Sequence, residues 1–274
     1  MLSLEAHHIV ALRTWVADHL PKQTYPKGGR PPILQDSDLV TLLIWNTLVL
    51  HQKPLKDLHT FARLYLSTEF RRLPKYNGFL AHCHRVLPKL WHLLEDLRSH
   101  ACVRLVDSTM LPVCKLHRAN RHRVAKSVAA FGYNHQGTHY GFKLHTSVSL
   151  DGKLCSFFFT PADVYDGQVL PELIDHRTRL AVGDSHYGGI IMRQFFWERF
   201  ETIVLASPHY KQKTKMTAEW QRLLLNRRTK IEAVFDRLKE HLQLASSFPR
   251  SINGYLLHYI SILLGYQILV LSQL

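Results

Sequence analysis

The sequence has few cysteines, and their spacing provides no framework for disulfides or for a metal. Only four cysteines occur among 274 residues, and none of them forms a CxxC pair. The 19 histidines lack the spacing of a zinc site, and the tightest Cys/His group is His82-Cys83-His84. This usage argues against a secreted, disulfide-stapled domain and against a structural zinc module, and it fits a protein of the reducing cytosol.

Signals for export and for nucleotide binding are also missing. Met1 to Glu5 contains neither a basic n-region nor an apolar h-region, so we expect no signal peptide. No glycine-rich loop of the Walker type occurs, so we expect no nucleotide cofactor. The stretch Tyr255 to Leu271 is almost wholly apolar, but His258, Ser261 and Gln267 interrupt it. We therefore favour a core or dimer helix, and no membrane, over the membrane span that its length also allows.

Acidic residues are scarce relative to basic ones. The chain carries 21 Asp and Glu against 35 Lys and Arg, which gives a formal net charge of +14. Such an excess indicates a polyanionic partner, with nucleic acid as the first candidate. A generally basic surface without a ligand is the alternative.

The chain divides near residue 100 into a helical part and a mixed part. Residues 1–100 have helical periodicity, interrupted by a basic, proline-rich loop at 26–32. The pattern predicts a first helix whose Leu4, Leu12 and Trp15 share a face, and later helices over about 36–50, 54–66 and 77–97, with Pro88 inside the last. Short helices with tight turns suit an N-terminal DNA-binding domain of the helix-turn-helix kind, or a plain helical scaffold.

Residues 101–274 alternate between strand and helix signals. Strands are predicted over 103–107, 141–150, 153–160, 180–184 and 202–206, with a hairpin turn at Asp151-Gly152. Helices are predicted over 169–174, 189–200 and 226–244. Three antiparallel strands followed by alternating helix and strand are typical of an RNase H-like core, a mixed five-stranded sheet flanked by helices. We therefore expect an α/β catalytic domain over 101–274.

Three carboxylates are the candidate active site. Asp107 and Asp184 each end a predicted buried strand, where a carboxylate is costly to desolvate unless a cation meets it. Glu232 lies at the edge of the apolar stripe of the predicted helix 226–244. Three such ligands can hold two divalent cations for in-line phosphoryl transfer. The alternative for Glu232 is an ordinary surface residue with cationic helical neighbours.

Several ordered motifs carry a resemblance to a known family. They are VDSTMLPVCK from Val106, HRANRHRVAK from His117, YGFKLH from Tyr140, TPADVYDG from Thr160, GDSHYGG from Gly183 and RRTKIEAVFDRLK from Arg227. Together they resemble bacterial insertion-sequence transposases of the DDE type, in particular the insertion-sequence-982 group. The last motif is similar to the family pattern Y-x2-R-x3-E-x6-K, with Arg228, Glu232 and Lys239 in place and Leu225 at the tyrosine position.

The resemblance implies a mechanism and a set of partners. Asp107, Asp184 and Glu232 would bind two Mg²⁺ ions, for which Mn²⁺ can substitute. The enzyme would bind the terminal inverted repeats of its element as a homodimer on double-stranded DNA, cleave the strand ends and transfer them to target DNA. It would work in the bacterial cytoplasm, at the nucleoid. Two alternatives stay open: a metal-dependent nuclease of the same core without strand transfer, and a catalytically inactive DNA-binding relative.

Further residues are candidate DNA contacts. A basic run follows the strand that carries Asp107, and we expect it to clamp the DNA backbone across the active site, because Asp107 ends that strand; a solvated loop is the alternative. We expect Arg228 and Lys239 to meet phosphates, and Tyr187 to stack on DNA or to pack in the core. Asp163 and Asp166 are further carboxylates, and we expect Asp166, which precedes Gly167, to be a turn residue rather than a ligand. The predicted DNA contacts are Lys115, Arg118, Arg121, Arg123, Lys126, Lys143, Tyr187, Arg228 and Lys239.

Overall fold

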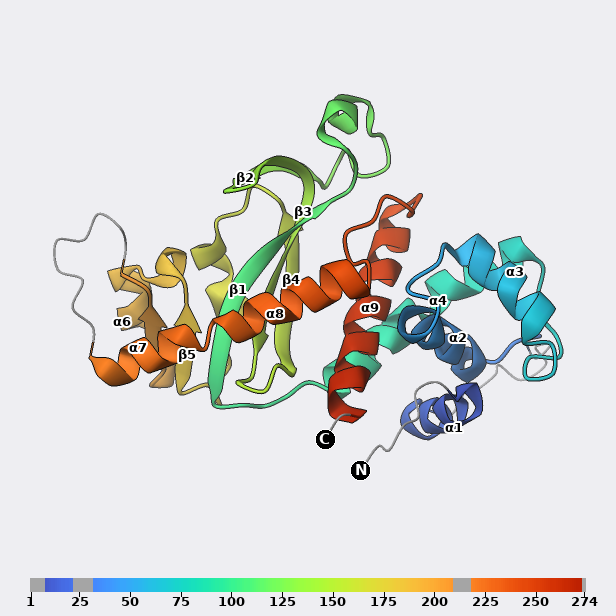
Figure 1. Cartoon of the computed structure of the whole chain (residues 1–274), viewed down its shortest axis with the longest axis horizontal. Helices are drawn as coiled ribbons and strands as arrows, with labels where there is room; N and C mark the ends of the chain where they lie inside the picture. The colour runs from blue at the N-terminus through green and yellow to red at the C-terminus, as the bar shows by residue number, and fades with distance from the viewer. Residues whose placement is uncertain (1–7, 22–31, 209–217, 273–274) are drawn as a thin grey trace. The chain divides into compact units, whose positions relative to one another are not determined.

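The structure is a computed structural model that describes residues 8–21, 32–208 and 218–272. The chain forms two compact units (Figure 1). The helical unit comprises the residues up to Leu97 together with 238–244 and 248 onward. The sheet unit comprises 98–237 and 245–247. The first boundary lies close to the expected one at residue 100, but the C-terminal segment, expected in the catalytic domain, belongs to the helical unit.

Five α-helices build the helical unit within the described residues: α1 (Ile9–His19), α2 (Asp36–Leu48), α3 (Leu55–Tyr65), α4 (Tyr76–Asp96) and α9 (Ile252–Ser272). Pro88 lies inside α4 without dividing it. Leu4 and the 26–31 part of the predicted loop lie outside the described residues.

Helix α9 is the core of the helical unit. It packs against α2 and α4, and a side chain at Gly265 would meet Thr47 of α2 at 2.7 Å, so the two helices approach closely. The helix is long and apolar enough to cross a membrane, but most of it is buried inside the unit. Burial of this kind is expected of a core helix in a helical bundle, the interpretation favoured from its sequence.

A mixed sheet forms the sheet unit. Its strands are β1 (Val103–Pro112), β2 (Ala130–Asn134), β3 (Gly137–Val148), β4 (Leu154–Pro161), β5 (Leu180–Gly183) and β6 (Ile203–Ala206). The order is β2-β3-β1-β5-β6, and β4 also pairs with β3. Strands β1, β3 and β4 are antiparallel neighbours, whereas β5 and β6 run parallel to β1. This is the predicted order of three antiparallel strands followed by alternating helix and strand.

Helices cover the sheet on its two faces. The elements are η1 (Leu116–Arg121), η2 (Asp166–Val169), α5 (Leu170–Leu173), η3 (Ser185–Tyr187), α6 (Ile190–Phe200), α7 (Glu219–Asn226), α8 (Thr229–Asp236) and η4 (Arg237–His241), the last of which begins in the sheet unit and ends in the helical one. A buried cluster joins the sheet to α5 and α6 through Val106, Leu170, Leu173, Tyr187 and Phe196. Helix α8 contacts β1 and crosses the sheet in Figure 1.

Two strand predictions needed correction. β1 does not end at Asp107: it continues to Pro112, paired with β3 from Leu105↔Val148 to Pro112↔Gly141. The polar residues Ser108 and Thr109 suggested a strand end, but pairing with β3 carries the strand past them. β2 was not predicted. The helix predicted over 226–244 is instead α8, which begins at Thr229, followed by the π-helical turn η4, which ends at His241. The helix α7, which ends at Asn226, was not predicted.

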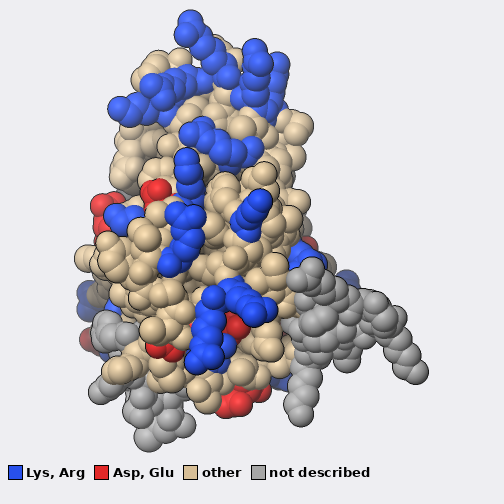
Figure 2. Space-filling view, turned by 90° about the vertical axis from the view of Figure 1, so that its right-hand side faces the viewer, with Lys and Arg blue, Asp and Glu red and all other residues tan. Residues whose placement is uncertain are grey.

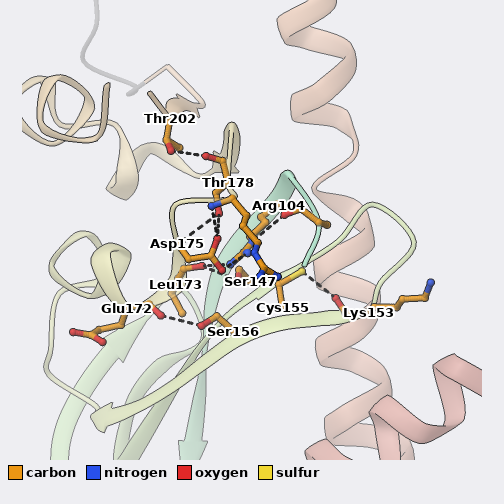
Figure 3. A network of polar contacts seen from close by, with 12 residues as sticks. Arg104, Ser147, Lys153, Cys155, Ser156, Glu172, Leu173, Asp175, Thr178 and Thr202 are labelled. Carbon is orange, nitrogen blue, oxygen red and sulfur yellow. Dashed lines mark hydrogen bonds and ion pairs between the residues drawn. The ribbon is translucent and has the colours of Figure 1, made fainter. Parts of the chain in front are cut away.

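The start of β1 is tied to the segment before β5 by a buried arginine (Figure 3). Arg104 donates to the carbonyls of Ala101 and Leu173 at 3.1 and 3.2 Å, and to the Asp175 carboxylate at 2.6 Å. Ser147 on β3 also donates to the Leu173 carbonyl, at 2.9 Å. These bonds fix the end of α5 against the sheet, and so fix the start of β5 relative to β1.

Candidate active site

The sheet brings Asp107 and Asp184 to the same level. β1 and β5 are paired in parallel, with Leu105 opposite Val182, and β5 ends at Gly183. Two residues beyond that pair, the chain reaches Asp107 on β1 and Asp184 after β5. Gly183 is required at this turn, because a Cβ there would lie 2.7 Å from the Tyr187 ring and 2.9 Å from Val106. The two carboxylates predicted from the sequence therefore lie at one edge, where β5 ends and β1 continues.

Asp107 is a half-buried carboxylate, with its side chain 17 % exposed and with few compensating contacts. Its Oδ1 accepts a 2.8 Å hydrogen bond from the Ser108 amide, and its Oδ2 accepts a longer one, 3.3 Å, from Arg228. Burial raises the pKa of Asp107 to about 6, although the Arg228 guanidinium acts in the opposite direction. Asp184 and Asp166 add to the rise in that pKa. The surroundings of Asp107 thus disfavour its ionised form relative to a carboxyl group in water.

Asp184 caps the 3₁₀ turn η3. Its Oδ1 accepts from the His186 amide at 2.9 Å, and its Oδ2 lies 2.7 Å from His186 Nδ1. The hydrogen bond that the Asp184 carboxylate accepts from the imidazole raises the pKa of His186. The segment before η2 supports this corner: Tyr165 Oη donates to the His186 carbonyl at 2.8 Å. A Cβ at Gly167 would lie 2.8 Å from the same carbonyl, so the two segments are in close contact.

Asp166 is a third carboxylate beside this pair. Lys143 on β3 donates to it at 2.9 Å and to the Val164 carbonyl at 2.8 Å, and His145 Nδ1 lies 3.7 Å away. Burial lowers the pKa of His145 to about 4, so this imidazole is neutral. Asp166 does begin a turn, as predicted, but its carboxylate is part of the site's charge distribution. Sequence reasoning missed the Lys143–Asp166 pair because only the fold brings residues so far apart in the chain together.

Two predicted DNA contacts are buried. Lys143 is 8 % exposed and its ammonium is held by Asp166 and Val164, so it presents no charge to DNA in this structure. Tyr187 is fully buried, and within the described part of the chain its hydroxyl has no hydrogen-bond partner. Burial raises the pKa of Tyr187 well above its ordinary value. Tyr187 therefore follows the packing alternative, not the stacking one: its ring fills the core under the aspartates.

Glu232 is the predicted ligand that the structure leaves outside the cluster. The apolar stripe of α8 is buried as predicted, at Ile231 and Val234 among others, but the Glu232 side chain is exposed. It lies one helical turn after Arg228, which pairs with Asp107, so both side chains emerge on the same flank of α8. Lys239 lies on η4, in the helical unit.

The oxygen ligands fit a hard divalent cation only in part. Among the described residues, no three of His, Cys, Asp and Glu are arranged as a metal site. The chemistry is nevertheless suitable, because Asp107 and Asp184 provide carboxylate oxygens, which Mg²⁺ and Mn²⁺ prefer. Burial, the largest cause of the raised pKa of Asp107, disfavours the charged form of this carboxyl, and a cation bound beside it would favour that form. Asp107 and Asp184, two of the three predicted ligands, thus lie at one edge of the sheet, and Glu232, the third, lies on α8.

The basic segment, residues 115–126, does not follow directly on Asp107. It starts three residues after β1 ends, and Asp107 lies five residues before that end, a separation of roughly 16 Å along the strand alone. The premise of the expected clamp across the active site, a strand that ends at Asp107, is therefore wrong. All five of its Lys and Arg side chains are exposed: Lys115, Arg118, Arg121, Arg123 and Lys126.

Residues 98–252 match the family described as "Transposase DDE domain". This match covers more than half of the chain and includes all three predicted acidic residues. The chain belongs to this family of DDE transposase domains. The DDE domain has the predicted RNase H-like core, in which the mixed sheet is flanked by helices. Neither the curated proteins nor the solved structures contain a match to the chain.

Membership settles the broad activity. A DDE transposase domain implies a catalytic transposase with DNA as its substrate, and enzymes of this family generally use divalent metal ions.

Proposed function

We propose that this chain is the transposase of a bacterial insertion sequence, resembling the insertion-sequence-982 group, that cuts and joins the ends of its own element in the bacterial cytoplasm. The observation that carries the proposal is the pair Asp107 and Asp184, side by side at the end of β5 in a DDE domain. Both belong to motifs that resemble the family's catalytic aspartates, and Glu232 occupies the family's glutamate position on α8.

The proposed active site uses Asp107, Asp184 and Glu232 to hold two Mg²⁺ or Mn²⁺ ions. Bound there, the ions would supply Lewis-acid chemistry for in-line phosphoryl transfer. In the first reaction, water attacks the phosphodiester at the element's end and the 3′ oxygen leaves as a hydroxyl. In the second, that 3′-hydroxyl attacks a phosphodiester of the target, and a target 3′ oxygen leaves. Neither reaction needs a covalent protein intermediate or a nucleotide.

Other parts of the chain would hold the DNA. The exposed cations of the basic segment suit phosphate contacts on double-stranded DNA, and Arg228, directly before α8, would act closer to the acidic residues. The helical unit would recognise the terminal inverted repeats. Two ends must be joined to one target, so we propose a homodimer on DNA, which light scattering on the complex with end DNA would test.

The test compares Asp107→Asn, Asp184→Asn and Glu232→Gln with wild type. Each variant should lose Mg²⁺-dependent cleavage of end DNA while keeping affinity for that DNA, because it removes one anionic ligand and no DNA contact. Asp163→Asn, an exposed carboxylate near the same loop, is the matched control and should cleave normally. Near wild-type cleavage by one of the three variants would remove that residue from the site.

Strand transfer separates the proposal from its alternative. A transposase should join cleaved ends to a target plasmid, whereas a nuclease with the same core would only cut. Cleavage without any joined product, under conditions where both ends and target are bound, would favour the nuclease.

A further inference from the structure

Two aromatic side chains on β2 face solvent in the sheet unit. Tyr133 is 77 % exposed and Phe131 is 49 % exposed. Phe131 pairs with Tyr140 and Tyr133 pairs with Thr138 on β3, so both rings lie on one face of the ribbon. Large aromatic side chains on a strand are normally covered, and an exposed pair on one face indicates a surface that a partner covers.

The aromatic face is held firmly in place. The Phe131 and Tyr140 rings pack with centroids 4.8 Å apart, and His122 of the basic segment meets the Tyr140 ring edge at 6.1 Å. Gly132, between the two aromatics, lies so close to Ala162 that a Cβ would come within 2.3 Å of its carbonyl oxygen. The exposed rings therefore stand on a fixed strand, and Tyr140 links that strand to the basic segment.

The charge around this face has a single sign. Between Ser108 and Leu150 the sequence contains no Asp or Glu, and the five cations of the basic segment are all exposed. Figure 2 shows Lys and Arg side chains gathered at the top of the molecule, over the segment that follows β1, with no acidic side chain among them. Such a surface is complementary to a polyanion, and it favours nucleic acid over a neutral protein surface.

A hollow lies on the same part of the sheet unit. It has a volume of about 380 Å³, and its lining includes Lys115, Leu116, Thr138 and Tyr140. Thr138 and Tyr140 are the partners of Tyr133 and Phe131 across the ribbon. The hollow therefore combines the Tyr140 ring with the Lys115 cation, and Tyr140 lies on the strand that pairs with β2. This lining suits a planar base attached to a phosphate.

We propose that residues 113–140, the binding lobe, hold unpaired nucleotides of DNA, whose bases stack on Tyr133 and Phe131 while the basic segment neutralises their phosphates. The bases of an intact duplex are already stacked on one another and offer no free face to these rings, whereas single-stranded bases do. The proposal deepens the transposase function and rests on it, because cutting and joining DNA ends creates single-stranded segments.

The test measures binding of the full chain to a fluorescent single-stranded oligonucleotide of mixed sequence and to a duplex of the same length, in EDTA so that no cleavage occurs. Tyr133→Leu and Phe131→Leu should each weaken single-strand binding roughly 5- to 150-fold, the equivalent of about 1–3 kcal/mol for one stacked base. Duplex affinity should change far less. Tyr133→Phe keeps the ring and should bind like wild type.

Trp197→Leu is the matched control, because Trp197 is also exposed, at 57 %, but lies on α6, which packs by β6 at the other end of the sheet from β2. It should leave both affinities unchanged. An oligonucleotide that carries 2-aminopurine adds a direct readout, since its fluorescence falls when the base stacks, and Tyr133→Leu should restore it.

Three outcomes would overturn the proposal. The first is single-strand affinity that does not change in the two leucine variants. The second is an equal loss for single strand and duplex, which would mean that the rings only support the basic segment. The third is a lower oligomeric mass of the leucine variants than of wild type, measured without DNA, together with unchanged DNA affinity. That result would assign the face to contact with a second copy of the chain. None of these binding results depends on Asp107, Asp184 or Glu232, so failure here leaves the proposed cleavage activity to its own test.

Discussion

Replacing Asp107 by Asn should make the metal-free protein more stable while it removes cleavage. The pKa of this carboxyl is raised from 3.8 to about 6 by burial, so the folded protein favours its neutral form. Each pKa unit corresponds to about 1.36 kcal/mol, and a rise of this size costs the folded state about 3 kcal/mol once the group is ionised. Asparagine has nearly the shape of aspartic acid and carries no charge at any pH. Asp107→Asn should therefore raise the free energy of unfolding by up to about 3 kcal/mol above pH 7.

The sign of this effect fixes its pH dependence. A group whose folded pKa lies above its unfolded pKa binds its proton more tightly in the folded state. Its contribution to stability is therefore fully present below about pH 4 and is lost as pH rises through about 6. The stability difference between Asp107→Asn and wild type should accordingly be small near pH 4 and reach its full size by about pH 7.

The assay is urea unfolding of both proteins in EDTA at several pH values between 4.5 and 8, followed by circular dichroism. Asp163→Asn, which removes an exposed carboxylate, should shift the midpoint little at any pH. Added Mg²⁺ should stabilise wild type and have a smaller effect on Asp107→Asn, since the variant lacks one anionic ligand. Equal stabilities of wild type and Asp107→Asn at pH 8 would refute the reasoning, because they would mean that the buried charge is already compensated.

Two further predictions follow from other parts of the sheet unit. Arg104→Met should destabilise the fold by about 3 kcal/mol in urea unfolding, because it removes three hydrogen bonds and leaves the Leu173 carbonyl and Asp175 without their partner; a loss below about 1 kcal/mol would show that water replaces the guanidinium. Changing Arg118, Arg121 and Arg123 together to Ala should flatten the plot of log affinity for DNA against log salt by roughly two to three units, at about 0.9 per lost phosphate contact; an unchanged slope would make the basic segment an ordinary solvated loop.

Much of the sheet unit could be predicted because its signals are local. The Asp151-Gly152 turn joins β3 and β4 as expected, with Gly152 at φ +90°, a conformation that favours glycine. β5 and β6 are short apolar runs between turn signals, and their bounds agree with the prediction to within one residue at each end. The same pattern drew attention to Asp184 at the end of β5, because a carboxylate directly after a buried strand is costly to desolvate.

The remaining features depend on contacts between distant residues. Whether Lys143 meets DNA or Asp166 is decided by how the segment before η2 folds back on β3. The sequence around Tyr187 is compatible with a buried ring and with an exposed ring, so it does not predict which of the two occurs. Helix α9 is apolar on every side, so its sequence indicates burial but not which unit contains it. In each case the local pattern is satisfied by two arrangements, and only tertiary packing selects one.

The length of β1 determines how DNA can use the sheet unit. A phosphodiester placed at Asp107 is separated from the end of β1 by roughly 16 Å. Successive phosphates of one strand in duplex DNA are about 3.4 Å apart along the helix axis, so DNA that follows β1 reaches the basic segment about five nucleotides from the reacting phosphate. Contacts at that distance add affinity without touching the reacting atoms. The loss of the three arginines should therefore raise the DNA concentration needed for half-maximal cleavage, while the rate at saturating DNA stays close to that of wild type. The nucleotides stacked on Tyr133 and Phe131 would likewise lie several nucleotides from the reacting phosphate. There the binding lobe would hold one DNA strand unpaired from the complementary strand.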